Sequence, residues 1–312
     1  MTDLFDVAVV GGGPAGLSAA VWLSRYLHRV VLIDSGDPRN WETRGVNGFL
    51  GLPHIRPAEL RALGRDEARH YGAVLVDDTV QSADRLDDAT FGLALESGAV
   101  YQARRVLLAI GLRDVWPDIP GLEKVYGETA HVCPDCDGYE ARGKKTVVIG
   151  HGRKAVGMAL NLSTWTRDII ICTNGHPPDL DELEYCEKLD ALNIPVLTDR
   201  VVSVCARDRR VHCLSLENGM DLDADKIFFA IGQYPADDLG AQLGCARDEG
   251  GHIIVDEHYH TSVRDVYAAG DIVPGAQLAI AAAADGAIAS VAIHKSLVPE
   301  GSKLEPLVTS EA

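Results

Sequence analysis

One hydrophobic pattern occurs twice along the chain: an apolar run, a glycine-rich turn and then a helix. The first copy is the run 6–10, the turn 11–16 and a predicted helix over 17–27. The second copy starts with the run 146–149 and continues into the turn 150–155. A second short apolar run follows each copy, at the spacing that a β–α–β unit requires. These later runs are residues 29–34 and 168–172.

Each copy is closed by a later apolar run that ends in Ala-Ile-Gly, at residues 106–111 and 227–232. The pattern therefore predicts an α/β fold with two doubly wound, Rossmann-like nucleotide-binding domains. A cluster of helix and strand breakers at 116–121 separates them. The last part of the chain is expected to fold back onto the first domain, which makes that domain discontinuous. The expected bounds are 1–116 with 243–312 for the first domain, including a flexible tail at 299–312, and 117–242 for the second.

Smaller elements are expected in the rest of the chain. A short strand is predicted at 252–255, and an alanine-rich helix is predicted from about residue 276. Residues 207–210 form a predicted turn, which allows Cys205 and Cys213 to face each other across a hairpin.

Composition and charge narrow the class of protein. Apolar residues make up 46% and charged residues 24% of the 312 residues, which excludes a disordered, collagen-like or coiled-coil chain. With 29 Lys and Arg against 46 Asp and Glu, the net charge is −17, so neither nucleic acid nor a membrane is expected as a partner. The longest apolar stretch, 278–293, contains Asp285 and is shorter than the ~20 residues of a membrane helix. Seven cysteines, an odd number, and an N-terminus without a secretion signal favour a cytoplasmic protein.

The first glycine-rich turn has the spacing of a dinucleotide-binding motif. Its three glycines allow, in order, the tight turn, the approach of a pyrophosphate to the backbone, and close packing of helix on strand. The helix that follows directs amides and a partial positive charge at the phosphates. Asp34 ends the next strand, where its carboxylate can accept hydrogen bonds from ribose hydroxyls and would repel a 2′-phosphate, so the turn suits FAD or NAD. The residues of the turn are Gly11, Gly13, Pro14, Ala15 and Gly16.

The second turn keeps the glycine spacing but changes the residues around it. Arg153 and Lys154 stand where small residues usually admit phosphates. The next strand ends in Thr173 and Asn174, so this domain has neither the carboxylate of an NADH site nor the basic groups of an NADPH site there. Two interpretations stay open: the domain has lost nicotinamide binding or holds another ligand, or NADPH binds through these two basic residues or a distant arginine.

Cys133 and Cys136 form a Cys-Pro-Asp-Cys motif just after the predicted domain crossover. Two intervening residues allow a small, reversible disulfide ring, and Pro134 suits the first turn of a helix, whose N-terminus lowers the pKa of a thiol. Asp137 follows directly and can exchange protons with the pair. A zinc knuckle needs two more ligands, and the sequence has neither a second CxxC nor a nearby pair of histidines, so no metal is expected. The other five cysteines are expected to be small core residues.

Asp271 ends the strand-like run Ala269-Gly270-Asp271, at the position where a doubly wound fold places its ligand. An aspartate there can equally cap the following helix. The histidines, among them His131 two residues before Cys133, are scattered singly along the chain. A lone histidine is more often a satisfied polar residue than a catalyst.

Together these residues resemble the low-molecular-weight thioredoxin reductase family of flavoproteins, over about residues 4 to 295. The specific part of the resemblance is the order of the motifs: a FAD-type turn, the CxxC followed by Asp137, a second glycine turn and then Ala-Gly-Asp. The resemblance implies an FAD cofactor. The positions that it assigns to FAD are the first turn, Asp34, Asn47, Gly111, Gly270, Asp271 and Gln277.

The resemblance also implies the chemistry and the partners of the cysteine pair. Cys136 is the cysteine that faces the flavin and accepts electrons, and Cys133 exchanges with the disulfide of a thioredoxin-like protein. Asp137 protonates the departing thiolate. A homodimer is expected, as in the family. The implied function is that of an FAD-dependent, thioredoxin reductase-like disulfide oxidoreductase.

The second domain departs from the family pattern, because Cys172-Thr173-Asn174 replaces a His-Arg-Arg-like run. The chain thus resembles NADPH-independent relatives, which take electrons from reduced ferredoxin or carry a second flavin in the vacated site. A basic patch including Arg142, Lys144 and Lys145 would suit an acidic ferredoxin. The alternatives are a conventional NADPH-dependent thioredoxin reductase, an oxygen-dependent dithiol oxidase, which tends to carry His where Asp137 stands, and a flavin-based redox sensor.

Overall fold

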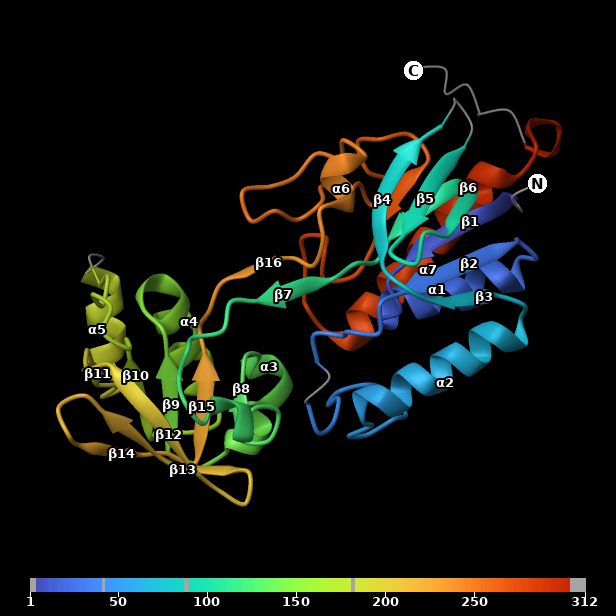
Figure 1. The fold of residues 1–312 in the computed structure, drawn as a ribbon. Helices are drawn as coiled ribbons and strands as arrows, with labels where there is room; N and C mark the ends of the chain where they lie inside the picture. The colour runs from blue at the N-terminus through green and yellow to red at the C-terminus, as the bar shows by residue number, and fades with distance from the viewer. Residues whose placement is uncertain (1–3, 41–42, 87–89, 181–182, 304–312) are drawn as a thin grey trace, which may run out of the picture. The chain divides into compact units, whose positions relative to one another are not determined.

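The computed structural model describes the chain except residues 1–3, 41–42, 87–89, 181–182 and 304–312 (Figure 1). The contacts within the chain divide it into two compact units. The chain passes between them through the short strands β7 (Leu112–Asp114) and β16 (Gln233–Pro235), which pair with each other. Unit 1 comprises Met1–Pro38, Leu60–Leu112 and Pro235–Ala312, and unit 2 comprises Arg39–Glu59 and Arg113–Tyr234.

The predicted α/β fold with two Rossmann-like domains is confirmed, but the unit bounds differ from the expected domain bounds. The segment 39–59 belongs to unit 2, as do residues 113–116, and the return to unit 1 starts at Pro235. The segment 39–59 follows a strand of unit 1 in sequence but bonds to unit 2. Its Arg39 guanidinium lies 2.8 Å from the Asp114 carboxylate. Part of the predicted tail, 304–312, lies outside the described residues.

Unit 1 is built on a seven-stranded sheet in the order β3-β2-β1-β6-β5-β4, with β17 paired to β6. The strand pairs are parallel between β3 and β2, β2 and β1, β1 and β6, and β6 and β17. The pairs are antiparallel between β6 and β5 and between β5 and β4. The bounds are β1 Leu4–Val10, β2 Val30–Asp34, β3 Val74–Asp77, β4 Val80–Arg85, β5 Phe91–Leu95, β6 Val100–Leu108 and β17 Val266–Ala268.

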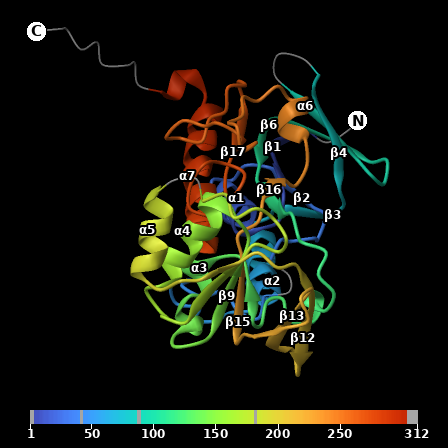
Figure 2. The ribbon, with the colours of Figure 1, turned by 90° about the vertical axis from the view of Figure 1, so that its left-hand side faces the viewer.

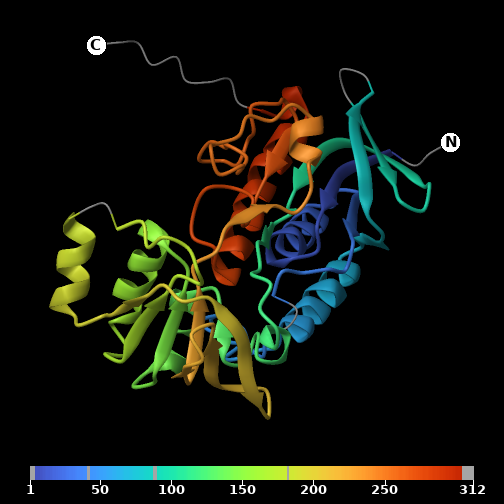
Figure 3. The same ribbon diagram turned by 60° about the vertical axis from the view of Figure 1, so that its left-hand side comes forward.

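Helices α1 (Pro14–Arg25) and α7 (Ala279–Leu297) lie side by side against one face of this sheet (Figures 1 and 3). Their packing requires a glycine in α7, because a Cβ on Gly286 would lie 2.0 Å from the carbonyl oxygen of Ala15. None of the helices that the structure describes combines the length and the apolar composition needed to cross a bilayer. The remaining helices of this part of the chain are α2 (Pro57–His70), α6 (Leu239–Gln242) and the 3-10 turn Glu300–Ser302.

Two predicted elements of the returning segment differ from the structure. The predicted strand at 252–255 is a single bridge between Ile253 and Arg247, because the chain turns again at 257–258. The alanine-rich helix begins three residues later than expected, at Ala279. In both cases the sequence shows the apolar run. It does not show at which residue the backbone hydrogen bonds of the strand or helix begin.

Unit 2 contains a five-stranded parallel sheet in the order β11-β10-β9-β15-β8 and a separate antiparallel sheet, β12-β13-β14. Helices α4 and α5 lie side by side over one face of the parallel sheet (Figures 1 and 2). The three-stranded sheet packs on the other face, where apolar side chains of both sheets form one core. The strand bounds are β8 Ala130–His131, β9 Thr146–Ile149, β10 Ile169–Cys172, β11 Val196–Leu197, β12 Val201–Arg207, β13 Arg210–Leu216, β14 Asp221–Asp223 and β15 Lys226–Phe229. The helices are α3 Pro134–Asp137, α4 Gly152–Leu162 and α5 Leu183–Ala191, with 3-10 turns at Leu122–Lys124 and Tyr139–Ala141.

Candidate active site

Cys133 and Cys136 form a disulfide in unit 2, with their Cα atoms 5.3 Å apart. Cys133 is the N-cap of the short helix α3. Pro134 follows at the first helical position, where it needs no amide partner and its fixed φ angle suits the first turn. The Cys136 amide donates to the Cys133 sulfur over 3.1 Å. A Cβ on Gly138 would lie 2.5 Å from the Trp165 ring, so only glycine lets the chain leave the motif here. Both cysteines are half-buried and therefore within reach of a reaction partner.

A chain of polar side chains leads from Asp137 into the interior of unit 2. An Asp137 carboxylate oxygen lies 3.3 Å from Nδ1 of His131. The other ring nitrogen of His131, Nε2, lies 3.1 Å from the Lys226 ammonium, which also donates to the Glu128 carbonyl oxygen over 3.0 Å. His131 is 6% exposed and Lys226 is 9% exposed. The three side chains can therefore hold or pass a proton behind the disulfide, shielded from water.

Burial is the main influence on the charge of Lys226. Desolvation lowers the pKa of Lys226, while the carboxylates of Asp137, Glu140 and Glu128 act in the opposite direction. A lysine in this setting gives up its proton more readily than an exposed one. In the sequence His131 is only a lone histidine. Lys226 lies 95 positions away from it, and no sequence signal indicates a role for this lysine.

We expect Lys226→Met to change the pH dependence of stability. Because burial lowers the pKa of Lys226 from its ordinary value of 10.5, the folded protein releases this proton at a lower pH than the unfolded chain does. The free energy of unfolding of the wild type should therefore rise, relative to Lys226→Met, as the pH increases from the folded pKa towards 10.5. Urea unfolding between about pH 7 and 10 measures the difference. Lys144→Met, at an exposed lysine, is the control, and parallel curves for wild type and Lys226→Met would contradict the expectation.

Asn47 lies against the cysteine pair within unit 2. Its Nδ2 donates to the Cys136 carbonyl oxygen over 3.2 Å and reaches an Asp137 carboxylate oxygen at 3.5 Å. Its Oδ1 accepts from Nδ1 of His54 over 3.0 Å. The amide thus orients both the backbone of Cys136 and the carboxylate beside it. No pattern in the sequence points to His54, which orients Asn47.

The first glycine turn, in unit 1, leaves no room for side chains on its strand side. A Cβ on Gly11 would lie 2.3 Å from the Ala109 carbonyl oxygen, and one on Gly16 would lie 1.9 Å from the carbonyl oxygen of Gly11. Gly11 also has a φ of +104°, which favours glycine. A Cβ on Gly13, by contrast, would meet no atom of the described residues within 4 Å. This open backbone, at the N-terminus of α1 with Pro14 in its first turn, fits a pyrophosphate.

Asp34 lies beside this turn and is 8% exposed. A Cβ on Gly12 would lie 2.1 Å from Asp34 Oδ2, so a side chain at this position would displace the Asp34 carboxylate. The Asp34 carboxylate has cationic partners: it bonds to the Arg61 guanidinium and lies 3.5 Å from that of Arg65. Its other oxygen accepts from the Gly36 amide over 3.3 Å. A ribose at this position would therefore share Asp34 with two guanidinium groups.

The other residues expected at the cofactor site in unit 1 follow the carboxyl ends of parallel strands. Gly270, with a φ of +80°, follows β17, and its Cβ would lie 2.8 Å from that of Ala15. Half-buried Asp271 comes next in the chain, and half-buried Gln277 lies between β17 and α7. Gly111 follows β6, with a φ of +69°. Ligands of doubly wound folds bind at this edge of the sheet, so the residues of unit 1 fit the adenosine diphosphate part of FAD.

The second glycine turn begins like the first but is covered by its own chain. The Gly11 amide donates to the Ile33 carbonyl oxygen over 2.8 Å, and the Gly150 amide donates to that of Cys172 over 3.0 Å. Gly152 corresponds to Gly13, yet its amide donates to the Pro178 carbonyl oxygen over 3.0 Å. The amide that would face a phosphate in this turn is therefore already bonded.

The loop that covers the second glycine turn also places the carboxylate of Asp179 beside the turn. Nδ1 of His151 lies 2.8 Å from the Asp179 carboxylate, and the rings of His151 and His176 stack at 4.8 Å. A Cβ on Gly152 would lie 3.5 Å from the Cβ of Asp179. Because Asp179 carries a negative charge, it opposes a phosphate group at this position.

The side chains that follow the end of β10 form hydrogen bonds to nearby backbone groups of unit 2. The Thr173 hydroxyl donates to the His176 carbonyl oxygen over 2.5 Å, and Asn174 Oδ1 accepts from the Val201 amide over 2.8 Å. Arg153 and Lys154 are exposed on α4. A hollow of about 340 Å³ lies between α3, α4 and the end of β15. Its lining includes Pro134, Lys154, Asn161, Ile231 and Gln233.

Comparison with known proteins shows the family of the chain. The pyridine nucleotide-disulphide oxidoreductase family profile matches residues 5–286. The chain is 30% identical over 285 residues to thioredoxin reductase tcpT of Claviceps purpurea (strain 20.1), covering 86% of this chain and 87% of that protein. It is 28% identical over 271 residues to a probable thioredoxin reductase of Arthroderma benhamiae, covering 78% of this chain and 67% of that protein.

Solved structures of the same fold span nearly the whole chain. The crystal structure of HlmI matches with a TM-score of 0.89 and 34% sequence identity. The match covers 96% of this chain and 94% of the HlmI chain. The crystal structure of the putative thioredoxin reductase TrxB from Bacillus anthracis matches with a TM-score of 0.87 and 28% sequence identity. The match covers 94% of this chain and 98% of the TrxB chain. The chain therefore belongs to the pyridine nucleotide-disulphide oxidoreductase family of FAD-binding enzymes, as a thioredoxin reductase-like member.

Proposed function

We propose that this enzyme moves electrons between FAD and the Cys133–Cys136 disulfide, and on to a thioredoxin-like protein, with a donor other than NADPH. Reduced FAD, when bound, supplies the two electrons. The disulfide takes up two electrons and two protons and becomes a dithiol. The dithiol then reduces the disulfide of the partner: the Cys133–Cys136 bond forms again, and the partner leaves as a dithiol.

The observation that carries the NADPH-independent part is the covered turn of unit 2. The Gly152 amide is bonded to Pro178, and the Asp179 carboxylate lies beside it. NADPH binding at this turn would have to break that bond, place a pyrophosphate beside a carboxylate, and find a partner for its 2′-phosphate. The residues at the end of β10 that could contact the 2′-phosphate are Thr173 and Asn174. The side chains of both already form hydrogen bonds to backbone groups of unit 2.

Reduced ferredoxin or a second flavin is the donor in this proposal. Exposed Arg142 and Lys144 offer positive charge to an acidic ferredoxin, whereas Lys145 is paired with Asp223 over 3.1 Å. The hollow between α3, α4 and β15 offers space for a flavin ring next to Pro134 of the redox motif. These two donors predict different cofactor contents, one or two flavins for each chain.

Asp137 handles the protons of the exchange in this proposal. It receives support from His131, which contacts its carboxylate, and from Asn47, which reaches the same carboxylate. A thiolate leaving Cys136 or the partner takes its proton from Asp137, and the buried His131–Lys226 pair restores that proton. Both cysteines end each cycle in the disulfide from which they started.

Two other functions have specific support. Arg200 lies near the end of β10, because its Cβ would be 3.4 Å from a Cβ placed on Gly175. A conventional NADPH-dependent thioredoxin reductase would need an arginine in this place. His131 places an imidazole beside the Asp137 carboxylate, and an imidazole base is what an oxygen-dependent dithiol oxidase uses. Both functions are tested in the experiment that follows.

We expect NADPH to leave the flavin absorbance of the purified holoenzyme unchanged in an anaerobic titration, while dithionite bleaches it. Reduced ferredoxin should also bleach it if it is the donor. Stoichiometric bleaching by micromolar NADPH, lost in Arg200→Ala, would contradict the proposal and establish the NADPH-dependent function. Bleaching by a small dithiol followed by rapid oxygen uptake would establish the dithiol oxidase instead, and no turnover with any donor would indicate a redox sensor.

A cytoplasmic location and a homodimer are part of the same proposal. The five cysteines outside the redox motif, all in the described part of the chain, are free thiols, which suits a reducing compartment. The homodimer rests on the resemblance to thioredoxin reductases.

A further inference from the structure

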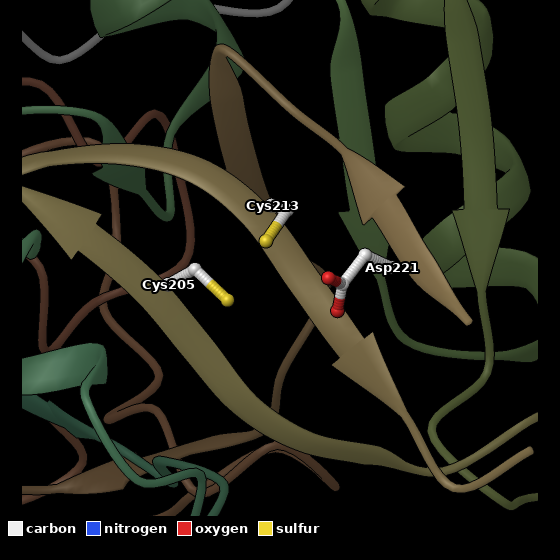
Figure 4. A group of neighbouring side chains, drawn as sticks. All are labelled: Cys205, Cys213 and Asp221. Carbon is white, nitrogen blue, oxygen red and sulfur yellow. The ribbon is translucent and has the colours of Figure 1, made fainter. Parts of the chain in front are cut away.

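The three-stranded sheet of unit 2 carries a group of metal-ligating side chains that the redox chemistry does not use (Figure 4). In the hairpin of β12 and β13, Cys205 stands directly opposite Cys213. Strand β14 adds Asp221, which is paired with Ser215 of β13. The two sulfur atoms and an Asp221 carboxylate oxygen lie within 4.8 Å of one another.

The hairpin turn and a bulge place the two cysteines face to face. Asp208 and Arg209 have φ angles of +48° and +62°, the pattern of a two-residue hairpin turn, and the predicted turn at 207–210 is confirmed. A register shift between Cys205 and Ala206 then sets Cys205 opposite Cys213.

The alternation of side chains along the strands keeps the group on one face. Val204 and Leu214 precede and follow the cysteines and are buried in the core under the sheet. Because neighbouring side chains in a strand point to opposite faces, the sulfur atoms lie on the other face. Figure 4 shows the two sulfur atoms and the Asp221 carboxylate turned toward the space between them. Both cysteines are half-buried, so the site is open to an ion from solution.

Neighbouring polar groups orient the carboxylate and set the charge of the site. The Ser215 hydroxyl donates to an Asp221 oxygen over 2.7 Å and lies 3.4 Å from the Cys205 sulfur. Burial, together with Cys205 and the carboxylates of Asp221 and Asp223, raises the pKa of Cys213 to about 12. Two sulfur atoms beside a carboxylate form a set of ligands for a cation, which displaces the thiol protons when it binds.

We propose that Cys205, Cys213 and Asp221 bind one Zn²⁺ ion, with water as the fourth ligand. Tetrahedral zinc has bonds of about 2.3 Å to sulfur and 2.0 Å to oxygen, which sets its ligand atoms roughly 3.5 to 3.8 Å apart. The three ligand atoms now lie within 4.8 Å of one another, so the side chains would have to close a gap of roughly 1 Å on binding. Each thiol gives one proton to the solvent, and no electrons are transferred. A disulfide between the cysteines would need an oxidant and would use neither the carboxylate of Asp221 nor the hydroxyl that orients it.

Zinc binding to the oxidised holoenzyme, in which the Cys133–Cys136 disulfide is closed, tests this proposal. After treatment with a chelator, calorimetric titration with Zn²⁺ should give one ion per chain and release about two protons, measured in buffers of different ionisation enthalpy. Cd²⁺ should bind with the ultraviolet absorption of cadmium thiolates. Cys205→Ser and Cys213→Ser should each weaken binding about 100-fold or more, and Asp221→Asn about 10-fold.

The matched control is Cys186→Ser, which removes another half-buried free thiol and should leave zinc binding unchanged. Flavin content and far-ultraviolet circular dichroism show whether each variant folds. Bound Zn²⁺ should also protect Cys205 and Cys213 from alkylation in the wild type, as peptide mass spectrometry measures. Binding that survives in Cys205→Ser, binding lost in Cys186→Ser, or alkylation of both cysteines at an unchanged rate would each overturn the proposal.

Discussion

Replacing Cys133 or Cys136 with serine is expected to lower disulfide reduction at least ~10³-fold, to background. Each variant keeps one sulfur atom of the pair, so it can neither store two electrons as a dithiol nor close the disulfide that releases the partner. A serine is close to cysteine in size and both sites are half-buried, so the fold should persist. The measurement is single-turnover reduction of a thioredoxin by the dithionite-reduced holoenzyme.

Two controls separate the loss of exchange from a loss of cofactor. Flavin content and bleaching by dithionite should match the wild type in both variants, because neither cysteine holds the cofactor in this proposal. Cys186→Ser should keep full activity, since Cys186 lies on α5 and outside the redox motif. Thioredoxin reduction that persists in Cys133→Ser would remove the cysteine pair from the mechanism.

Gly16→Ala should destabilise unit 1 by about 3 kcal/mol and release FAD. The added Cβ would lie 1.9 Å from the Gly11 carbonyl oxygen, which is backbone and cannot swing aside. Strand β1 and helix α1 would have to separate, and the turn between them is the expected pyrophosphate site. Urea unfolding and the flavin absorbance that remains after gel filtration measure the two effects.

Gly13→Ala is the matched control in the same turn. Its Cβ would meet no described atom within 4 Å, and Gly13 already has a φ of −76°, which alanine adopts readily. The free energy of unfolding of the FAD-free protein should change by less than about 0.5 kcal/mol. FAD retention should still fall, because the methyl group stands where the phosphates approach. Equal stability of Gly16→Ala and Gly13→Ala would refute the packing argument.

The sequence by itself determined the features that depend on local order. The doubled strand–glycine turn–helix pattern predicts both nucleotide-binding sheets, since each β–α–β unit is contiguous in the chain. The CxxC, the first glycine turn and the hairpin turn at 207–210 are equally local. Each requires particular residue types within a few positions, because backbone φ angles and ring closure are set by neighbouring residues.

Only the tertiary structure decided which distant segments meet. No local signal shows that Asn47 bonds to the Cys136 carbonyl oxygen, or that Lys226 reaches His131. The cover that Pro178 forms over the Gly152 turn is likewise invisible in the motif, whose spacing is intact. Such contacts join residues whose separation along the chain is arbitrary. Lys226 reaches His131 because β15 and β8 pair in one sheet, and the other two contacts form where loops fold over the ends of other elements.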